Sequence, residues 1–437
     1  MSPESPRWTH HRESLQQLLA TSLGLADPRP LVRAHLALTG DLLKVGGRIF
    51  PLSPESRIVA LSLGKAAPAM AQAASSALGP ALHQGLLIAP EVPPGLPARF
   101  HAIRGGHPLP DEGSLRGGEA AEELVRGLES QDLLLALVSG GGSACMEIPV
   151  PGIDLETLRE VNRTLILSGA GIEEINLIRS ALSCLKRGGL ARRAVPAQTI
   201  GLVLSDVTGD RLELVASGPT VEASLLPAEV RQIARRHHLE GLLPASVFES
   251  LEAAPAFPAI RPEPYNLVIG SNAWLAGSVA RATIGMGFEA RVVATDITGE
   301  ARAVGERIAS TLRRMRSAPL PNPLALIYGG ETTVQVRGAG HGGRNQELAL
   351  SAAIHLEGVE RTALMAFGTD GVDGNSDAAG AVVEEDTCQR ASRLGWSPRD
   401  ALEQNDSHGL FHRLGDCLHT GPTGTNLNDL IIALLFP

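Results

Sequence analysis

The chain has 437 residues, with 38 basic and 47 acidic side chains and a formal net charge of −9. This composition, with 43% hydrophobic residues, excludes a disordered protein and disfavours nucleic-acid or membrane partners, because both are bound through clustered positive charge. The four cysteines are widely spaced, no apolar run approaches the ~18 residues of a membrane span, and the start lacks a signal peptide. We therefore expect a soluble cytoplasmic protein, monomeric or homodimeric.

Helical patterns come first along the chain. Residues 14–45 predict two helices separated by a proline-containing break at 27–30, because leucine and alanine recur at three- and four-residue spacing. Apolar strand-like runs then alternate with helical patterns. The runs cover residues 58–63, 86–89, 133–138, 199–204, 267–269, 291–294, 324–328 and 362–367. This alternation predicts parallel sheets covered on both faces, with ligands at the carboxyl ends of the strands.

A proline-rich stretch at 253–264 precedes a new strand–helix pair and predicts a domain boundary. We therefore predict an α/β protein made of two α/β/α domains with mostly parallel sheets. The N-terminal, Rossmann-like domain would cover residues 1–255, and the C-terminal α/β domain would cover residues 265–437. We expect the active site in a cleft between these two domains.

Two loops that follow predicted strands favour anion binding. The strand 133–138 runs into Ser-Gly-Gly-Gly-Ser-Ala at 139–144, whose glycines let successive N–H groups point into one concavity that can hold phosphate oxygens. A tight strand-to-helix turn is the alternative. Lys65 follows the strand 58–63 at the start of a predicted helix, where it either approaches anionic oxygens or is a surface lysine. The loop is not a Walker A motif, which would require glycine at Val59.

Carboxylates follow two other predicted strands. Asp206 and Asp210 come after 199–204, and a carboxylate with neighbouring hydroxyls suits Mg²⁺, which also takes water and substrate phosphates. We favour a functional role for Asp206, whereas capping of a predicted helix at 211–217 is the alternative for Asp210. Asp370 follows 362–367 and is a candidate for metal binding, base catalysis or substrate contact. The nearby Asp373 and Asp377 are interpreted as turn residues.

Glycines in the C-terminal half formally match a dinucleotide-binding fingerprint. A predicted strand at 334–337 leads into Gly338, Gly340 and Gly343, which satisfy G-x-G-x-x-G. The next carboxylate at a strand end comes later than the usual ~20 residues, and polar residues open the following helix. We therefore favour a loop that presents Arg344 to a phosphate or carboxylate. The segment 418–429 offers hydroxyls and amides that either bind a polar substrate or cap a turn.

Seven ordered motifs together resemble the glycerate 2-kinase family, over nearly the whole chain from about residue 14. They are Leu-Gly-Lys-Ala at 63–66, Gly-Gly-His-Pro at 105–108, the glycine loop at 139–144, Ser-Asp-Val-Thr-Gly-Asp at 205–210, Gly-Gly-Arg-Asn-Gln-Glu at 342–347, Gly-Thr-Asp-Gly at 368–371 and Gly-Pro-Thr-Gly-Thr-Asn at 421–426. The resemblance implies a C-terminal domain of the MOFRL type. It also implies Mg²⁺-dependent transfer of the γ-phosphoryl group of ATP to the 2-hydroxyl of D-glycerate.

The resemblance further implies that Lys65, Asp206, Arg344 and Asp370 are catalytic. We expect Lys65 and Arg344 to neutralise phosphate oxygens and the glycerate carboxylate, while one aspartate binds Mg²⁺ and the other accepts the 2-hydroxyl proton. The expected substrate- and phosphate-binding residues are His107, Ser139, Gly140, Gly141, Gly142, Ser143, Glu331, Asn345, Thr423, Thr425 and Asn426. Two alternatives remain: an NAD(P)H-dependent hydroxypyruvate reductase that uses the loop 338–343, and a non-enzymatic sugar-acid-binding regulator.

Overall fold

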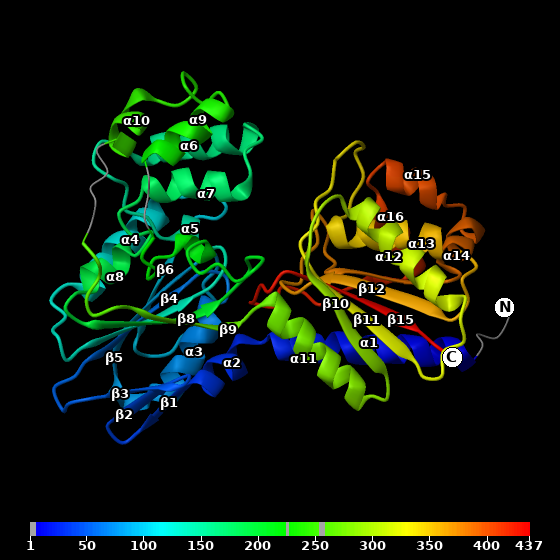
Figure 1. The fold of residues 1–437 in the computed structure, drawn as a ribbon, viewed down its shortest axis with the longest axis horizontal. Helices are drawn as coiled ribbons and strands as arrows, with labels where there is room; N and C mark the ends of the chain where they lie inside the picture. Colours follow the sequence, from blue (N-terminus) through cyan, green and yellow to red (C-terminus); the bar gives the residue numbers. More distant parts are fainter. Residues whose placement is uncertain (1–5, 224–226, 253–257) are drawn as a thin grey trace. The chain divides into compact units, whose positions relative to one another are not determined.

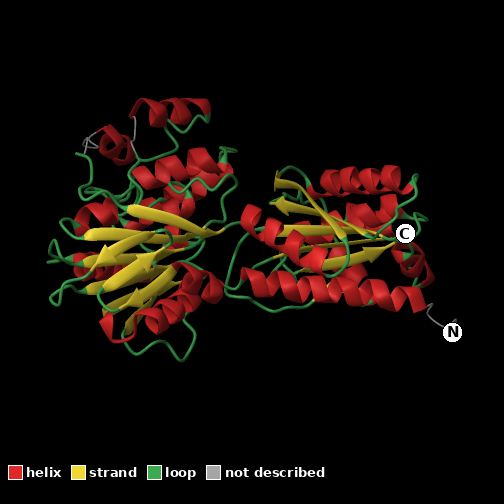
Figure 2. Cartoon of the chain, turned by 60° about the horizontal axis from the view of Figure 1, so that its bottom comes forward, coloured by secondary structure: helices red, strands yellow, loops and turns green. Residues whose placement is uncertain are grey.

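The computed structural model describes residues 6–223, 227–252 and 258–437, and the chain divides into two compact units (Figure 1). The central unit comprises Pro28–Ile269. The terminal unit comprises the chain up to Asp27 together with Gly270–Pro437. Each unit has its own six-stranded sheet with helices on both faces (Figure 2).

The central unit contains the elements from α2 to β9. They are α2 (Pro28–His35), β1 (Leu36–Thr39), β2 (Leu42–Val45), β3 (Arg48–Pro51), β4 (Ile58–Leu63), α3 (Ala67–Leu78), η1 (Gly79–Ala81), β5 (Leu82–Ala89), β6 (Phe100–Arg104), α4 (Glu112–Val125), β7 (Leu133–Val138), α5 (Gly142–Cys145), α6 (Leu155–Leu167), α7 (Ile172–Ala181), α8 (Gly189–Ala194), β8 (Gln198–Leu204), η2 (Val215–Ser217), α9 (Pro227–Arg236), α10 (Ala245–Glu252) and β9 (Tyr265–Gly270).

The large sheet of the central unit has the strand order β6-β5-β4-β7-β8-β9. Strands β4, β5, β6, β7 and β8 pair in parallel, and Leu63, Val138 and Val203 lie side by side near the carboxyl ends of three of them. Every residue of β4 and β7 is buried, because α3 covers one face of the sheet while α4 and α8 cover the other. The loops after these strands therefore emerge together at one edge of the sheet.

The terminal unit contains α1 and the elements from α11 onward. They are α1 (Pro6–Ala26), α11 (Asn272–Gly285), β10 (Glu289–Ile297), α12 (Ala301–Arg316), β11 (Leu324–Gly330), α13 (Arg344–Leu356), β12 (Thr362–Gly368), β13 (Gly380–Glu384), α14 (Thr387–Arg393), α15 (Pro398–Glu403), α16 (Ser407–Leu414), β14 (Cys417–Leu418) and β15 (Asp429–Leu435). Its sheet has the order β10-β11-β15-β12-β13-β14.

The predicted α/β class is confirmed, but the sheet of the terminal unit is mixed rather than mostly parallel. Strand β10 pairs in parallel with β11, whereas β15 lies antiparallel between β11 and β12. The apolar run 430–435 indicates burial on both faces and carries no information about strand direction. A loop without a helix joins β14 to β15, so the chain returns in the opposite direction.

Helix α1 belongs to the terminal unit, although the sequence prediction placed residues 1–255 in one domain. The helix packs on α11, and Arg12 forms ion pairs with Asp416 (2.6 Å) and Glu384 (3.3 Å). The ring of His11 stacks on Phe436 at a centroid distance of 3.7 Å. These contacts join residues far apart in the sequence, so local patterns do not reveal them. Part of the predicted boundary, residues 253–257, lies outside the described residues.

Three local predictions were wrong. Residues 36–45, predicted as the end of a helix, form β1 and β2 of a small antiparallel sheet, with Gly40 at positive φ in the turn. Residues 334–337 form no strand, and the preceding residue, Thr333, makes an isolated bridge to Glu300. Residues 211–217 form a turn and the short helix η2 instead of a capped helix.

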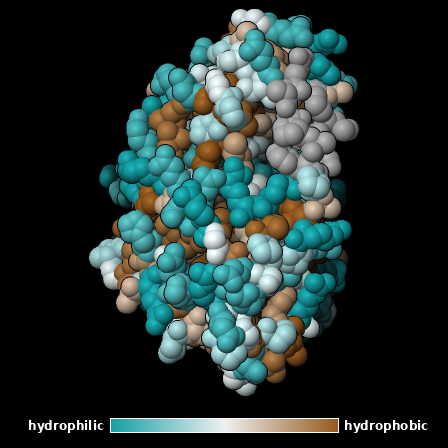
Figure 3. Space-filling model, turned by 90° about the vertical axis from the view of Figure 1, so that its left-hand side faces the viewer, coloured by the Kyte–Doolittle hydropathy of each residue, from teal (hydrophilic) through white to brown (hydrophobic). Residues whose placement is uncertain are grey.

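The visible face of the central unit carries both hydrophilic and hydrophobic residues (Figure 3). Figure 3 shows hydrophilic residues interspersed with smaller groups of hydrophobic ones on the side that lies at the left of Figure 1. Among the described residues, no helix has both the length and the apolar character needed to cross a membrane.

Candidate active site

The carboxyl edge of the central sheet brings together several of the site residues predicted from the sequence. Lys65 follows β4, His107 follows β6, the glycine loop follows β7 and Asp206 follows β8. The backbone N–H of Lys65 donates to the carbonyl of Gly140 over 2.9 Å, which joins the β4 loop to the glycine loop. These four segments converge because β6, β5, β4, β7 and β8 are successive parallel strands whose carboxyl ends lie at one edge of the sheet.

Two glycines allow the loops to approach each other closely. A Cβ on Gly64 would lie 2.4 Å from the carbonyl oxygen of Ser139, and Gly64 has a φ of +106°. A Cβ on Gly140 would lie 1.8 Å from Oδ2 of Asp206, so the aspartate carboxylate rests directly against the Gly140 backbone. Only glycine fits at Gly140 without displacing this carboxylate.

Lys65 and His107 flank the glycine loop at its next residue. A Cβ on Gly141 would lie 3.1 Å from Cγ of Lys65 and 3.4 Å from Nε2 of His107. Burial, together with the positive charges of Lys65 and Arg179, lowers the pKa of His107 and so favours its neutral imidazole. In its neutral form His107 adds no second positive charge beside Lys65, and its ring offers one hydrogen-bond donor and one acceptor.

The two serines of the loop make different contacts. The hydroxyl of Ser139 donates to the carbonyl of Leu63 (3.1 Å) and accepts from the N–H of Ala66 (3.0 Å), so it fastens the loop to the end of β4. The hydroxyl of Ser143 bonds that of Ser217 over 2.8 Å. Ser217 has a positive φ of 61°, an uncommon conformation for a residue with a side chain, and sequence patterns gave no sign of it.

A second group of charged residues surrounds Arg344 in the terminal unit. Arg344 is the first residue of α13, and Asp429 is the first residue of β15. The guanidinium bonds Asp429 through Nε (2.5 Å) and Nη2 (3.0 Å), and its Nη1 pairs with Glu331 over 2.9 Å. Arg344 and Glu331 were predicted from the sequence, but Asp429 was not, although it is a lone carboxylate at the start of an otherwise apolar run.

Strand register explains why these carboxylates converge. Asp429 lies opposite Gly330 of β11 and Gly368 of β12, so Glu331 and Asp370, which follow these strands, emerge on either side of it. A Cβ on Gly368 would lie 3.1 Å from Oδ1 of Asp370 and 3.4 Å from Oδ1 of Asp429. Arg344 therefore pairs with Asp429 and Glu331, and the charge of Asp373 also acts on it.

The charges of this group shift one another's pKa values. Burial raises the pKa of Asp429 to about 6, against the opposing effect of Arg344. For Arg344, burial disfavours the charged form, but the hydrogen bonds and charge of Asp429 and the charge of Glu331 raise its pKa above the ordinary value. Arg344 is thus a permanent cation, and its carboxylate partner on the exposed side is Glu331, whose side chain is 50% exposed.

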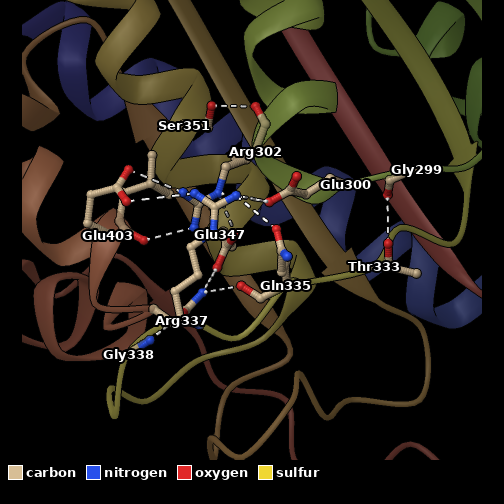
Figure 4. A network of polar contacts seen from close by, with 12 residues as sticks. Gly299, Glu300, Arg302, Thr333, Gln335, Arg337, Gly338, Glu347, Ser351 and Glu403 are labelled. Carbon is tan, nitrogen blue, oxygen red and sulfur yellow. Dashed lines mark hydrogen bonds and ion pairs between the residues drawn. The ribbon is translucent and has the colours of Figure 1, made fainter. Parts of the chain in front are cut away.

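The segment that leads to Arg344 is held by a network of ion pairs (Figure 4). Nε of Arg302 on α12 lies 3.2 Å from both Glu300 and the buried Glu347 of α13. Arg337 pairs with Glu300, and both arginines reach Glu403 of α15. Because Glu347 lies in the first turn of α13, this network fixes the start of the helix and with it Arg344.

Asp373, interpreted from the sequence as a turn residue, caps α13. Its carboxylate accepts hydrogen bonds from the backbone N–H groups of Asn345 (3.0 Å) and Gln346 (2.8 Å). Both side-chain amides also donate to it, and burial raises the pKa of Asp373. The predicted binding residue Asn345 therefore uses its amide groups inside the protein, and the N-terminus of α13 already holds an anionic group.

The glycines of the formal fingerprint pack against protein backbone. A Cβ on Gly338 would lie 2.4 Å from the carbonyl oxygen of Gln404, and one on Gly340 would lie 2.5 Å from Asp406. A Cβ on Gly343 would lie 2.4 Å from Asp373. Close packing within the terminal unit thus accounts for all three glycines.

The predicted binding residues near the C-terminus form a loop beside Asp370. Thr423 donates to the carbonyl of Thr369 over 2.6 Å, and its N–H bonds the carbonyl of Asp370 over 3.1 Å. Asn426 accepts from the N–H of Asn428. The hydroxyl of Thr425 is buried and has no hydrogen-bond partner among the described residues. Thr423 and Asn426 therefore shape the loop that holds Asp370.

The described residues contain no group of three or more His, Cys, Asp or Glu side chains arranged to hold a metal ion. This does not conflict with the chemistry of Mg²⁺, which keeps several waters and is bound through one or two carboxylates plus substrate phosphates. Asp206 and Asp370 each offer one such carboxylate beside a loop. The parallel sheet, the glycine loop and the neighbouring lysine define an α/β protein suited to an anionic ligand.

Comparison with known proteins identifies the family. The model described as a domain of unknown function (DUF4147) matches residues 14–252, and the MOFRL family model matches residues 324–429. The D-glycerate 2-kinase of Thermotoga maritima is 40% identical, over 87% of this chain and 91% of its own length. The glycerate 2-kinase of Pyrococcus horikoshii is 34% identical over 97% of both chains.

A solved structure agrees with these sequence relatives. The crystal structure of the Thermotoga maritima glycerate kinase has a TM-score of 0.86 and 36% identity, over 98% of this chain and all of its own. One relative of 34% identity, from Agrobacterium vitis, carries a hydroxypyruvate reductase name; it aligns over 97% of this chain and 94% of its own. The chain belongs to the glycerate kinase family.

Proposed function

We propose that this protein transfers the γ-phosphoryl group of ATP to the 2-hydroxyl of D-glycerate, giving 2-phospho-D-glycerate and ADP. Membership of the glycerate kinase family supports this reaction. The observation that carries it is the contact of the Asp206 carboxylate with Gly140, beside Lys65 and His107 at the carboxyl edge of the central sheet. This arrangement combines a carboxylate, a cation and a glycine loop, which are parts that phosphoryl transfer uses.

The reaction requires one bond to form and one to break. The 2-hydroxyl oxygen bonds to the γ-phosphorus while the bond from this phosphorus to the β,γ-bridging oxygen breaks, and ADP leaves. The hydroxyl proton passes to a carboxylate, for which Asp206 and Asp370 are our candidates. Lys65 and the glycine loop would hold the phosphate oxygens, because a compact ammonium and backbone N–H groups stabilise the charge on the transferred group.

Arg344 would act on a second anionic group of the substrates. Its Nε and Nη2 are fixed by the buried Asp429, and its Nη1 pairs with the half-exposed Glu331. We propose that a phosphate or the glycerate carboxylate displaces Glu331 from Nη1, while Asp429 keeps the guanidinium in place. Because Asp429 already holds Arg344 in place, the arginine side chain loses less conformational entropy when the substrate binds.

Mg²⁺ fits the residues present if it is held by one of the two candidate aspartates together with ATP. When bound, it would neutralise charge on the β- and γ-phosphate oxygens. Asp206 is the stronger candidate, because its carboxylate lies against the glycine loop that we assign to the phosphates. Asp370 would then accept the proton of the substrate hydroxyl.

The reductase alternative is less well supported. A dinucleotide places its pyrophosphate on the N–H groups at the N-terminus of a helix. In α13 these groups are already bonded to Asp373 at 2.8 and 3.0 Å. The fingerprint glycines Gly338 and Gly340 pack on the chain near residues 404–406 rather than line an open loop.

We propose ATP and D-glycerate as the small-molecule partners and the cytoplasm as the compartment, in a monomer or homodimer. The four cysteines are free, which agrees with a reducing compartment. To test the function, purified protein is assayed for ADP release with D-glycerate, ATP and Mg²⁺, and in parallel for NADH oxidation with hydroxypyruvate. Our proposal requires glycerate-dependent ADP release. NADH oxidation without ADP release would reject it in favour of the reductase.

A further inference from the structure

A buried ion pair and an additional arginine lie beneath the glycine loop. Nζ of Lys186 bonds Oε2 of Glu147 over 2.7 Å, and both side chains are less than 5% exposed. This pair is neutral by itself. Arg179, on α7, lines the same small cavity of about 10 Å³ as this pair, together with Ser143 of the glycine loop.

The single carboxylate of Glu147 faces two cations, Lys186 and Arg179, so these three side chains carry one net positive charge. Nε of Arg179 is buried and has no hydrogen-bond partner among the described residues, and the same is true of Oε1 of Glu147 in this cavity. Burial lowers the pKa of this arginine, with the charge of Glu147 opposing that effect. A cavity of this size holds about one water, which can bond Nε but cannot balance the charge.

The environment of Arg179 points to the loop that we assign to the substrates. Arg179 and Lys65 both act electrostatically on His107, which flanks Gly141. Pro110, from the segment that follows His107, also lines the cavity. Two cations, Lys65 and Arg179, therefore approach the glycine loop, and Lys65 is the one that we assign to phosphate.

We propose that Arg179 binds the carboxylate of the hydroxy-acid substrate at the glycine loop, an inference that rests on the proposed function. The planar guanidinium presents paired N–H donors that match the two oxygens of a carboxylate. A small acid bound there would supply the negative charge needed to neutralise Arg179. A phosphate of the nucleotide is the other anion that could bind Arg179. The KM values for D-glycerate and for ATP distinguish these two ligands.

The test compares Arg179→Gln and Arg179→Lys with Arg163→Gln, which changes a 57% exposed arginine on the neighbouring helix α6. We expect Arg179→Gln to raise the KM for D-glycerate at least tenfold while the KM for ATP changes less than twofold. Arg179→Lys should also raise the KM for glycerate, because an ammonium lacks the fork. Arg163→Gln should behave as the wild type.

The melting temperature, measured with and without D-glycerate, distinguishes a substrate-binding role of Arg179 from a purely structural one. Removing this partly buried charge should leave the melting temperature unchanged or raise it, and D-glycerate should stabilise the wild type but not Arg179→Gln. An unchanged KM for glycerate, a rise confined to the KM for ATP, or a fall in the melting temperature with equal losses for both substrates would overturn the assignment.

The same measurements separate this inference from the proposed function. A wild-type protein that releases no ADP with glycerate, yet is stabilised by D-glycerate through Arg179, would reject the kinase activity and keep the binding site. If the wild-type protein phosphorylates glycerate and Arg179→Gln has no effect, the kinase activity is kept and the binding site at Arg179 is rejected.

Discussion

Arg344 and Asp429 are joined by two hydrogen bonds, of 2.5 Å from Nε to Oδ2 and 3.0 Å from Nη2 to Oδ1. The pair connects the first residue of α13 to the first residue of β15, between the ends of β11 and β12. Asp429 is therefore a positioning residue for the arginine that we assign to an anionic group of the substrates.

Replacement of this carboxylate should cost both activity and stability. We expect Asp429→Asn to lower kcat at least tenfold and the free energy of unfolding by roughly 2 kcal/mol, because the partly exposed guanidinium of Arg344 loses its charged partner. Glu331→Gln is the matched control at the exposed side, and it should retain stability within about 0.5 kcal/mol. Steady-state kinetics and urea denaturation check both variants, and wild-type kcat in Asp429→Asn would show that the pair has no role in catalysis.

Lys65 is one of three lysines, and the other two provide internal comparisons. Lys44 is exposed on β2, and Lys186 is buried with Glu147. Lys65→Ala should lower kcat by about two orders of magnitude, as expected for a lost electrostatic donor. Lys44→Ala should have wild-type kinetics. Lys65→Arg tests whether charge alone is sufficient, and full activity of Lys65→Ala would remove the residue from the mechanism.

Gly140 is a sharp steric test of the Asp206 assignment. In Gly140→Ala the new methyl group would overlap the Asp206 carboxylate, which must move. We expect kcat to fall about 100-fold, because a displacement of about 1 Å at a reacting group is sufficient for such a loss. Gly24→Ala, in open space on α1, is the control and should leave kcat unchanged. If Gly140→Ala is as active as Gly24→Ala, the carboxylate position is not important for turnover.

Glu384 should make stability depend on pH. Burial raises its pKa from 4.5 to about 7 despite the nearby Arg12. Because the folded state binds the proton more tightly, its stabilising contribution is complete below about pH 4.5 and is lost as the pH rises through about 7. Glu384→Gln should remove roughly 2.5 kcal/mol of this pH dependence in urea denaturation between pH 5 and 8. Glu13→Gln, an exposed change on α1, should keep the wild-type pH profile.

Much of the central site could be predicted from the sequence, because each of its parts follows a strand directly. The apolar runs that became β4, β7 and β8 indicated parallel neighbours, and parallel strands bring Lys65, the loop 139–143 and Asp206 to one edge. What local patterns could not show is the close packing of Asp206 on Gly140, since this depends on side-chain direction after a turn.

The terminal unit was harder to predict, because its key contacts join distant residues. Arg344 and Asp429 are 85 residues apart, and their pairing depends on the insertion of β15 between β11 and β12. Asp373 looked like a turn residue because its role as a cap requires α13 to lie beside it. Arg179 stood on a helix without any motif, and only its partly buried position beside the glycine loop distinguishes it.

The central claim is transfer of a phosphoryl group to the 2-hydroxyl of D-glycerate, and phosphorus NMR of the product tests it most directly. The spectrum reports donor, acceptor and position of the new ester together. We predict equal amounts of ADP and 2-phospho-D-glycerate from ATP and D-glycerate. A product phosphorylated at the 3-hydroxyl, or inorganic phosphate without any phosphoglycerate, would contradict the account.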